Sequence, residues 1–450
     1  MRYKNLNYLP MKNFIIIISL LCLAFNSNSQ NIYTIAGIGT SGFSGDNGPA
    51  LFAELAVPGS VALDAIGNIY ICDTYYGRIR KIDATTGIIT TIAGNGTSQA
   101  DSIPAISAKI QQPTGIDIDA AGNIYITEFL YNQVRKINTS GIITTIAGIH
   151  FTSGGFSGDN GPATSAMLDR PYDVAVDTAG NVYIADGGNN RIRMVNTSGI
   201  ITTVAGSNSG VLGDGGPATL AQLIRPEGVT VSHGNIYISD YYHYTIRKVN
   251  NAGIITTIAG NGIQGNSGDG GLATSAAIGG PRGIKVDANG NVFFADYYYS
   301  TIRKINPSGI IDLVAGTGIN GYSGDGGSAV LAQVAAVDVT VDAFGNLYIA
   351  DGNNNRIRKV CNGTCALNVN ELNTIYQISI YPNPTTENLF ISDENNAFQN
   401  STIQIKNYLG QVVFTTPFTS QINLQNLSAG MYFLTIQDKS SSKTVKIIKQ

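Results

Sequence analysis

Hydrophobic and polar residues alternate with a period of two along most of the chain. Within residues 171–206 the segments PYDVAVD, NVYIAD, RIRMVN and IITTVAG alternate in this way, and the short turns TAGN, GGNN and SG separate them. This pattern is typical of short β-strands joined by tight turns. The segment therefore predicts four antiparallel strands, which is one blade of a β-propeller.

Three short markers of this unit return six times in step. The TIAG-like tetrad ends at Gly37, Gly94, Gly148, Gly206, Gly260 and Gly316, with spacings of 57, 54, 58, 54 and 56 residues. A glycine–asparagine turn recurs at Asn68, Asn123, Asn181, Asn235, Asn291 and Asn346. A basic strand carries Arg80, Arg135, Arg193, Arg247, Arg303 and Arg358. A fixed period of this length predicts six repeated blades.

The two ends of the repeat array predict how the ring closes. The sixth repeat ends near Val360 without a fourth strand, whereas an unattached fourth-strand copy, residues 31–37, precedes the first repeat. We expect this copy to complete the last blade, because closure removes an open sheet edge. The fold class is all-β: a six-bladed β-propeller whose N-terminal strand closes the last blade, followed by a small C-terminal β-sandwich.

The ends of the chain differ from the repeats. Residues 14–23 are an apolar run behind a basic start, which is typical of a secretory signal peptide and too short to span a membrane. No other segment is long and apolar enough to be a membrane span, so we expect no transmembrane segment. The predicted divisions are a signal peptide at 1–29, the propeller at 30–361, a linker at 362–375 and the C-terminal domain at 376–450.

Charge and cysteine content narrow the function. Residues 30–372 contain 19 Lys and Arg against 26 Asp and Glu, a net charge of −7 without a basic cluster, which argues against nucleic-acid binding. In an oxidising compartment Cys361 and Cys365 are a candidate disulfide. Cys72 occupies a position that is alanine in sister repeats, so it is predicted to be a small buried residue. We expect a monomer.

Acidic residues recur in every repeat. One series lies in the insertion between the fourth and first strands, at Asp46, Asp101, Asp159, Asp214, Asp269 and Asp325. It either caps the short helix that follows, which we favour, or binds Ca²⁺ or a sugar. The other series ends the second strand, at Asp73, Glu128, Asp186, Asp240, Asp296 and Asp351, and is predicted either to pair with the arginines across the hairpin or to form hydrogen bonds to the turn. Residues needed in every blade indicate a structural role.

Function is expected where the repeats differ. The turn between the second and third strands is aromatic in four blades, and these side chains are candidate ligand-binding residues or packing residues: Tyr75, Tyr76, Phe129, Tyr131, Tyr241, Tyr242, Tyr244, Tyr297, Tyr298 and Tyr299. A second candidate set lies in the central funnel: Asp117, Asp173, Glu227, Arg282, Lys285 and Asp338. Blades two and five lie opposite each other in a six-membered ring, so Asp117 and Lys285 are expected to face each other across the channel.

The repeats resemble NHL repeats of the bacterial kind with a GDGGPAT insertion, over about residues 31–360. The tail is similar to the type A sorting domain of the type IX secretion system. The matching features are Tyr381-Pro382-Asn383-Pro384, Leu409-Gly410, the segment 427–432 and a lysine-rich last strand. This resemblance implies a Bacteroidetes-like bacterium, contact of residues 376–450 with the secretion machinery, and passage through the periplasm to the medium or the outer cell surface.

The expected function is a non-catalytic recognition protein for a glycan, a peptide or a protein partner. The alternatives are a hydrolase or lyase acting in the central funnel, and a purely structural surface protein. No Ser–His–Asp or histidine-rich metal pattern is evident, so we assign no catalytic residue and no metal site. No cofactor is expected, and Ca²⁺ is kept as the one alternative.

Overall fold

The computed structural model describes residues 30–150, 153–207, 210–362, 378–393, 401–407, 411–437 and 442–450. The predicted signal peptide, Cys365 and the Leu409-Gly410 turn lie outside these ranges. The chain forms two compact units, Met1–Cys365 and Ala366–Gln450, and each is described by itself.

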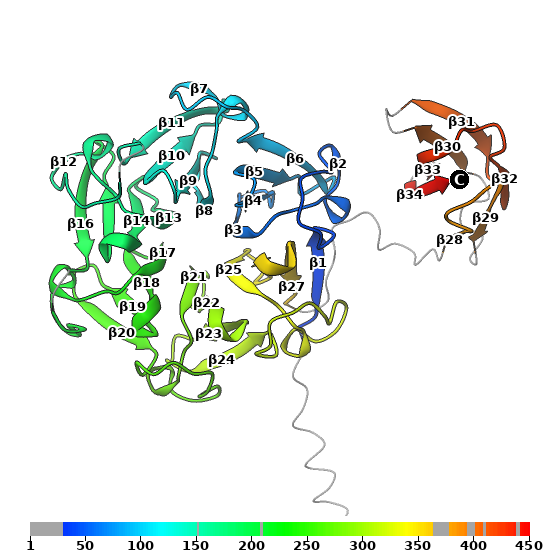
Figure 1. Cartoon of the computed structure of the whole chain (residues 1–450). Helices are drawn as coiled ribbons and strands as arrows, with labels where there is room; N and C mark the ends of the chain where they lie inside the picture. Colours follow the sequence, from blue (N-terminus) through cyan, green and yellow to red (C-terminus); the bar gives the residue numbers. More distant parts are fainter. Residues whose placement is uncertain are drawn as a thin grey trace, which may run out of the picture. The chain divides into compact units, whose positions relative to one another are not determined.

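The first unit is a ring of six antiparallel sheets (Figure 1). The innermost strands are β3 (Pro58–Leu63), β8 (Pro113–Ile118), β13 (Pro171–Val176), β17 (Pro226–Ser232), β21 (Pro281–Val286) and β25 (Ala336–Val341). The second strands are β4 (Ile69–Asp73), β9 (Ile124–Glu128), β14 (Val182–Asp186), β18 (Asn235–Asp240), β22 (Val292–Asp296) and β26 (Leu347–Asp351). The third strands are β5 (Arg78–Ile82), β10 (Gln133–Ile137), β15 (Arg191–Val195), β19 (Thr245–Val249), β23 (Thr301–Ile305) and β27 (Arg356–Val360).

The outer strands complete the blades. They are β6 (Ile88–Ala93), β11 (Ile142–Ala147), β16 (Ile200–Ala205), β20 (Ile255–Ala259), β24 (Ile311–Ala315) and β1 (Ile32–Ala36). In three blades a two-residue strand of the insertion covers the outer edge: β2 (Gly48–Pro49), β7 (Ile103–Pro104) and β12 (Gly161–Pro162). Each insertion then forms one short 3₁₀ helix: η1 (Ala50–Phe52), η2 (Ala105–Ser107), η3 (Ala163–Ser165), η5 (Ala218–Leu220), η7 (Ala273–Ser275) and η9 (Ala329–Leu331).

The N-terminal strand closes the ring as predicted. β1 pairs antiparallel with β27, and Ile32 lies opposite Val360 in a sheet of order β1-β27-β26-β25. Ile32 and Ala36 are fully buried, so this strand also contributes to the core. The six-bladed propeller and its closure are therefore confirmed.

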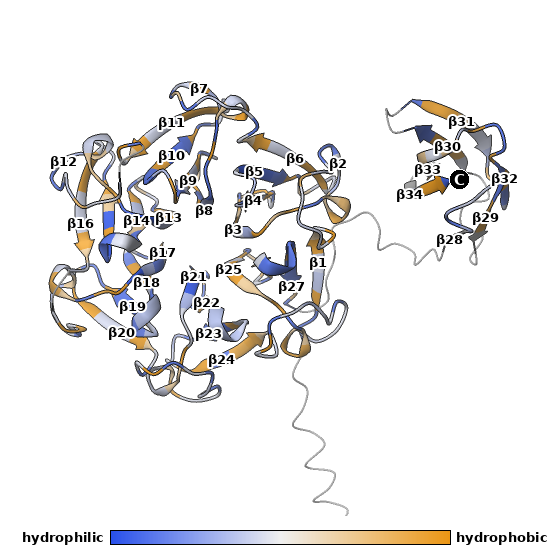
Figure 2. Ribbon diagram, viewed as in Figure 1, coloured by the Kyte–Doolittle hydropathy of each residue, from blue (hydrophilic) through white to orange (hydrophobic). Residues whose placement is uncertain are grey.

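The core lies between the blades, because each apolar cluster of the ring joins two neighbouring sheets. One cluster packs Cys72 and Ile79 of the first blade against Ile116 and Ile126 of the second. Cys72 is free and fully buried, which confirms its predicted role as a small core residue. Figure 2 shows apolar positions on every blade around the ring rather than in one patch. Burial of apolar area thus holds the sheets face to face.

The glycine of the TIAG tetrad is required by its backbone. Gly94 has a φ of 92°, and a Cβ at this position would lie 2.1 Å from the carbonyl oxygen of Gly77. Only glycine adopts this conformation next to another backbone without strain. The repeated tetrad therefore marks where each outer strand turns into the insertion.

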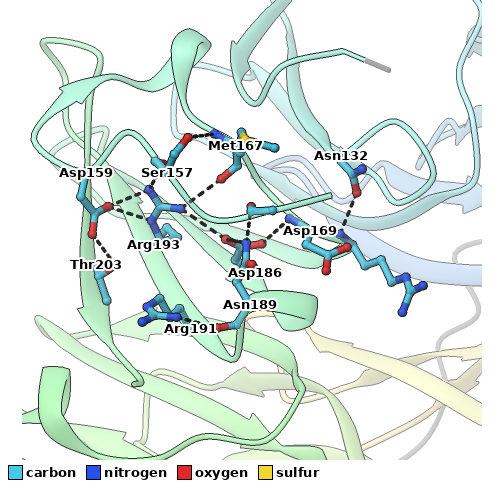
Figure 3. A network of polar contacts seen from close by, with 12 residues as sticks. Asn132, Ser157, Asp159, Met167, Asp169, Asp186, Asn189, Arg191, Arg193 and Thr203 are labelled. Atoms are coloured by element: carbon cyan, nitrogen blue, oxygen red, sulfur yellow. Dashed lines mark hydrogen bonds and ion pairs between the residues drawn. The ribbon is translucent and has the colours of Figure 1, made fainter. Parts of the chain in front are cut away.

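A buried arginine lies between two carboxyl groups in five of the six blades, and Figure 3 shows the cluster of the third blade. In the third blade, fully buried Arg193 pairs with Asp159 of the insertion at 2.7 Å and with Asp186 at the end of β14 at 3.3 Å. The equivalent insertion pairs are Arg80–Asp46, Arg135–Asp101, Arg247–Asp214, Arg303–Asp269 and Arg358–Asp325, at 2.6 to 3.1 Å. The second acidic series pairs across the hairpin as predicted at Asp73, Asp186, Asp240, Asp296 and Asp351. In the second blade Glu128 instead accepts a hydrogen bond from Gln133.

The interpretation of the insertion aspartates as helix caps is wrong. The residues before these short helices are Pro49, Pro104, Pro162, Pro217, Leu272 and Ser328, and none of these six described helices has a side-chain cap. The carboxylates reach the buried arginines instead. They fasten each insertion to the third strand of its own blade.

The second unit contains two small sheets. One has the order β28-β29-β32, from β28 (Ile378–Tyr381), β29 (Asn388–Asp393) and β32 (Gln421–Asn423). The other has the order β31-β30-β33-β34, from β30 (Thr402–Asn407), β31 (Val412–Pro417), β33 (Gly430–Gln437) and β34 (Ser442–Lys449). Their core includes Leu389, Ile405, Ile422 and Leu434. In the described parts of the chain no helix is long and apolar enough to cross a membrane.

Candidate functional site

The second and third residues of the innermost strands depart from the usual alternation between the two faces of a sheet. In all six blades the pairing of the first strand with the second shifts register after its first residue, for example between Pro171 and Asp173 and between Pro226 and Gly228. A register shift of this kind re-aims side chains that would otherwise alternate between faces. The second residues of all six strands and the third residues of four of them line one space.

That space is a cavity of about 300 Å³ on one side of the ring. The innermost strands contribute Ser60, Tyr172, Asp173, Glu227, Arg282 and Asp338 to its wall. The turns between the second and third strands contribute Thr74, Phe129, Tyr297 and Asn353. Tyr297 belongs to η8 (Tyr297–Tyr299), which with η4 (Gly187–Asn189), η6 (Tyr241–His243) and η10 (Gly352–Asn354) completes the short helices of the ring. The cavity therefore lies at the end of the channel where these turns gather.

Two arginines hold one buried glutamate at the edge of the cavity. Nε of Arg225 lies 2.7 Å from Oε1 of Glu227, and Nε of Arg282 lies 2.7 Å from Oε2. The Glu227 side chain is almost fully buried, whereas those of Arg225 and Arg282 are 31% and 21% exposed. Burial raises the pKa of Glu227, and the two guanidinium groups partly oppose that effect. We call Arg225, Glu227 and Arg282 the mouth triad.

Local backbone geometry sets the direction of Arg225. It precedes β17 with a φ of 56°, and its N–H donates to the side chain of Asn190 in the preceding blade at 2.8 Å. Arg170 makes the same bond to Asn132 one blade earlier. A left-handed conformation is costly for a residue with a side chain, and here the bond to the neighbouring blade maintains it.

Tyrosine rings surround the mouth triad. The guanidinium carbon of Arg282 lies 3.6 Å from the ring centre of Tyr297, and that of Arg225 lies 5.0 Å from Tyr172 and 4.9 Å from Tyr241. Nη1 of Arg225 also donates to the Tyr242 hydroxyl at 2.9 Å. These contacts favour the charged arginines through the negative faces of the rings. They hold both side chains in place at the cavity wall.

Two carboxyl groups form the floor of the cavity. Asp338 accepts hydrogen bonds from Ser60 Oγ at 2.7 Å and from the backbone N–H of Val61 at 3.0 Å, across the junction of the sixth and first blades. Asp173 accepts from the backbone N–H of Val229 in the next blade at 2.9 Å. Burial raises the pKa of both groups, and the nearby carboxylate of Asp338 raises that of Asp173 further.

An ion pair crosses the channel below this floor. Nζ of Lys285 on β21 lies 3.0 Å from Oδ1 of Asp117 on β8, from opposite blades. Asp117 also accepts the backbone N–H of Val176 at 2.9 Å. Burial lowers the pKa of Lys285, but the attraction of Asp117 outweighs this and the pKa is raised overall. The pair bridges the channel, so a ligand is expected to enter the cavity from its mouth.

The structure joins the two predicted candidate sets in part. Phe129 and Tyr297 of the aromatic set line the same cavity as Asp173, Glu227, Arg282 and Asp338 of the funnel set. Tyr241, Tyr242 and Tyr298 form a second layer: Tyr241 is buried and lies 4.9 Å from Tyr242 and 5.5 Å from Tyr298, ring to ring. Lys285 lines a second, smaller cavity that Asp173 and Asp338 also line, and Asp117 pairs with it there.

The remaining aromatic candidates lie outside the cavity wall. Tyr75 and Tyr76 meet edge to face, with 5.5 Å between ring centres, and are 70% and 43% exposed. Tyr131 is buried and accepts a hydrogen bond from Gln99. Tyr244 occupies the left-handed position that ends η6, and the ring of Tyr299 covers Gly279. Cys361 is disulfide-bonded, and its predicted partner Cys365 lies outside the described residues.

Most of the lining residues of the cavity are absent from the predicted sets, and Tyr172 and Arg225 are the largest of them. Tyr172 occupies the second position of its strand, where the six blades carry Gly59, Thr114, Tyr172, Glu227, Arg282 and Val337. This variability between blades is the signal that could have indicated Tyr172 as a cavity residue. Among the described residues no group of three or more His, Cys, Asp or Glu is arranged to hold a metal ion.

Comparisons with known proteins agree with this architecture. Residues 379–450 match the family described as "Secretion system C-terminal sorting domain". Residues 151–212, 209–265 and 262–322 match the "Teneurin NHL domain". Mouse Teneurin-4 is 32% identical over 232 residues, which are 46% of this chain and 8% of Teneurin-4. Protein SUPPRESSOR OF QUENCHING 1 of Arabidopsis thaliana is 26% identical over 70% of this chain and 31% of its own length. The chain thus spans less than a third of these curated relatives.

Solved structures share the fold. A protein of unknown function from Bacteroides thetaiotaomicron superposes with a TM-score of 0.55 at 21% identity, over 74% of this chain and 76% of the other. An auxiliary nutrient binding protein from Bacteroides ovatus superposes with a TM-score of 0.53 at 15% identity, over the same shares. At these identities the likeness shows the fold alone.

The ring of six sheets defines this chain as a six-bladed β-propeller. More specifically, it is an NHL-repeat propeller with a type IX secretion system sorting domain at its C-terminus. The sorting domain indicates export to the cell surface or the medium.

Proposed function

We propose that this exported propeller is a recognition protein whose ligand, a glycan or a peptide segment, enters the cavity beside the mouth triad. The observation that carries the proposal is the convergence of Arg282, Glu227, Tyr172, Tyr297 and Phe129 on one cavity of about 300 Å³. All five occupy positions that differ between blades, so they are not needed to build a blade. Concave sites with aromatic walls and a few fixed polar groups are typical of ligand binding.

The described geometry favours recognition of a small polar group or the end of a polymer. The cavity volume lies at the lower end of the range for small-molecule sites. Auxiliary nutrient binding proteins from two Bacteroides species have the same propeller fold, so this fold is used for nutrient binding in other proteins.

The test is a glycan and peptide array probed with the purified full-length chain, with and without Ca²⁺. Saturable binding is expected, and Tyr297→Ala should weaken it about tenfold or more because the ring supports Arg282 and lines the cavity. Tyr75→Ala is the matched control, since Tyr75 is exposed outside the cavity wall and should leave the affinity unchanged. Loss of binding from Tyr75→Ala alone would move the site to the outer aromatic residues, and no saturable hit would remove the proposal.

A hydrolase or lyase is the second candidate, favoured by one observation. Asp173 and Asp338 lie on the cavity floor with raised pKa values, as a general acid requires. An enzyme would convert the ligand found on the array. Recovery of that ligand unchanged after long incubation with the protein would exclude this candidate.

A further inference from the structure

We infer that the ligand is an acidic glycan, bound through the carboxylate of a uronic-acid residue by Arg282 and Arg225. This inference rests on the proposed function and deepens it. It follows from the charge of the mouth triad, the hydrogen-bond donors that the triad leaves unused, and the rings and hydroxyl groups around it.

The mouth triad carries an unbalanced positive charge. Two guanidinium groups share one carboxylate, and each contacts it through Nε. Below them, Lys285 and Asp117 neutralise each other. The carboxyl groups of Asp173 and Asp338 already accept the backbone N–H groups of Val229 and Val61. The positive charge nearest the mouth of the cavity is therefore left for an anionic group.

Arg282 has the donors that such an anion needs. Its terminal nitrogens donate no hydrogen bond that the described part of the chain provides, although its side chain is only 21% exposed. A guanidinium whose Nε is occupied still presents a parallel pair of terminal N–H groups, which matches the two oxygens of a carboxylate. Arg225 differs, since its Nη1 already donates to Tyr242. Arg282 is therefore assigned the principal contact.

The arginine is already oriented for this contact. The Tyr297 ring lies 3.6 Å from its guanidinium carbon, and Glu227 fixes Nε from the side. A side chain held in its binding conformation loses little entropy when the ligand arrives. Glu227 is a positioning residue, because its own carboxylate is buried between the two arginines.

The rest of the wall suits a sugar ring rather than an inorganic anion. Phe129 and Tyr172 meet edge to face at 5.0 Å between ring centres, and both line the cavity. Aromatic faces accept the C–H face of a pyranose. Gln112, Thr114 and Asn353 add side-chain donors and acceptors for hydroxyl groups around the same wall. A sugar residue that carries both a carboxylate and several hydroxyl groups is a uronic acid.

The test is calorimetric titration of the purified full-length chain with three matched oligosaccharides: a uronic-acid oligomer, its neutral counterpart and an amino-sugar counterpart. The uronic-acid oligomer should bind about tenfold or more tightly than the neutral one, because hydrogen bonds to a charged group contribute more than neutral ones. Arg282→Gln should abolish this preference. Arg282→Lys should retain part of the preference, because lysine keeps the positive charge but lacks the parallel pair of N–H donors.

Arg78→Gln is the matched control. Arg78 also stacks on an aromatic ring, with its guanidinium carbon 3.5 Å from the ring centre of Phe43, but it lies outside the cavity wall. It should leave the preference intact. Thermal unfolding of each variant establishes that it is folded, and the preference of the unaltered protein decides the question even if Arg282→Gln fails to fold.

The outcomes separate this inference from the proposed function. Equal binding of acidic and neutral oligomers, lost in Tyr297→Ala, would overturn the carboxylate contact and leave the recognition site in place. Tighter binding of the amino-sugar oligomer would overturn the carboxylate contact and would indicate that Asp173 and Asp338 bind the ligand instead. No binding of any oligosaccharide, together with a peptide hit on the array, would overturn the glycan assignment alone. No saturable ligand in either experiment would overturn both.

Discussion

Two kinds of arginine–carboxylate cluster occur in the propeller, and they differ in repetition and exposure. Arg193, between Asp159 and Asp186, has counterparts at the same position in all six blades, and its side chain is fully buried. The mouth triad occurs once, and its arginines remain partly exposed at a cavity wall. The same pair of chemical groups therefore serves two purposes in one ring.

The difference shows how a repeat protein separates stability from recognition. The arginine–aspartate pair that every blade contains fastens the insertion to the third strand, so a change to it should destabilise that blade. Glu227 and Arg282 occupy a position where the other blades carry glycine, threonine, tyrosine or valine, so a blade does not need a charged residue there. Changes at repeated positions should therefore lower stability, whereas changes at unrepeated cavity positions should lower binding.

The largest effect is expected from removing the strand that completes the sixth blade. A variant lacking residues 31–37 loses β1, with buried Ile32 and Ala36 and the ladder to β27. The free energy of unfolding should fall by about 5 kcal/mol or more, from lost apolar burial and hydrogen bonds. Denaturant unfolding measures it, and a chain lacking only residues 1–29 is the control. An unchanged midpoint would contradict the closure of the ring by β1.

The next effect tests the repeated arginine. Arg193→Met leaves Asp159 and Asp186 without their buried partner and should cost about 3–5 kcal/mol. Arg191→Met, at a partly exposed position on the same strand, should cost much less. Urea unfolding of both variants makes the comparison. If Arg193→Met stays within about 1 kcal/mol of the parent, the repeated cluster is not a stability element.

The smallest effect is the pH dependence of these clusters. A fully ionised arginine with two carboxylates carries one excess negative charge. Burial accordingly raises the pKa of Asp73, Asp186 and Asp351 from 3.8 to about 6, and that of Asp296 to about 7. The folded state then binds protons more tightly than the unfolded state. These groups contribute stability that is complete below pH 3.8 and is lost as the pH rises through about 6 to 7.

Unfolding measured between pH 4 and 8 should therefore show stability from these groups decreasing with rising pH and levelling off above about 7. Asp296→Asn removes one of them and should make the decline shallower. A stability that rises steadily from pH 4 to 7, unaltered by Asp296→Asn, would show that the clusters are ionised throughout and that their charge is balanced in another way.

The strands, the number of blades and the closing strand were predictable because each depends on local pattern or on counting. Period-two alternation marks a strand wherever it occurs, and the missing fourth strand after Val360 required a donor. The pairing of the second acidic series with the arginines was also predictable, because a hairpin brings adjacent strands into register.

The residues of the cavity wall were harder to predict from the sequence. A strict alternation would place Arg282 and Gly283 on opposite faces, and the register shift that overrides it leaves no signature in the residues themselves. The left-handed conformation of Arg225 was equally unpredictable, because arginine rarely adopts this conformation. The role of Asp159 was missed because its partner lies 34 residues away, on a strand with which the insertion shares no periodic pattern.

The pairing of β1 with β27 also sets the order in which the protein can be completed. The two strands come from opposite ends of the propeller sequence, and the contact Ile32–Val360 encloses all the other blades. Contacts with so large a sequence separation form slowly, because the closure entropy of the whole intervening chain must be overcome first. A chain leaving the ribosome, or threading through an export channel, therefore has its first strand waiting without a partner until the last blade has emerged.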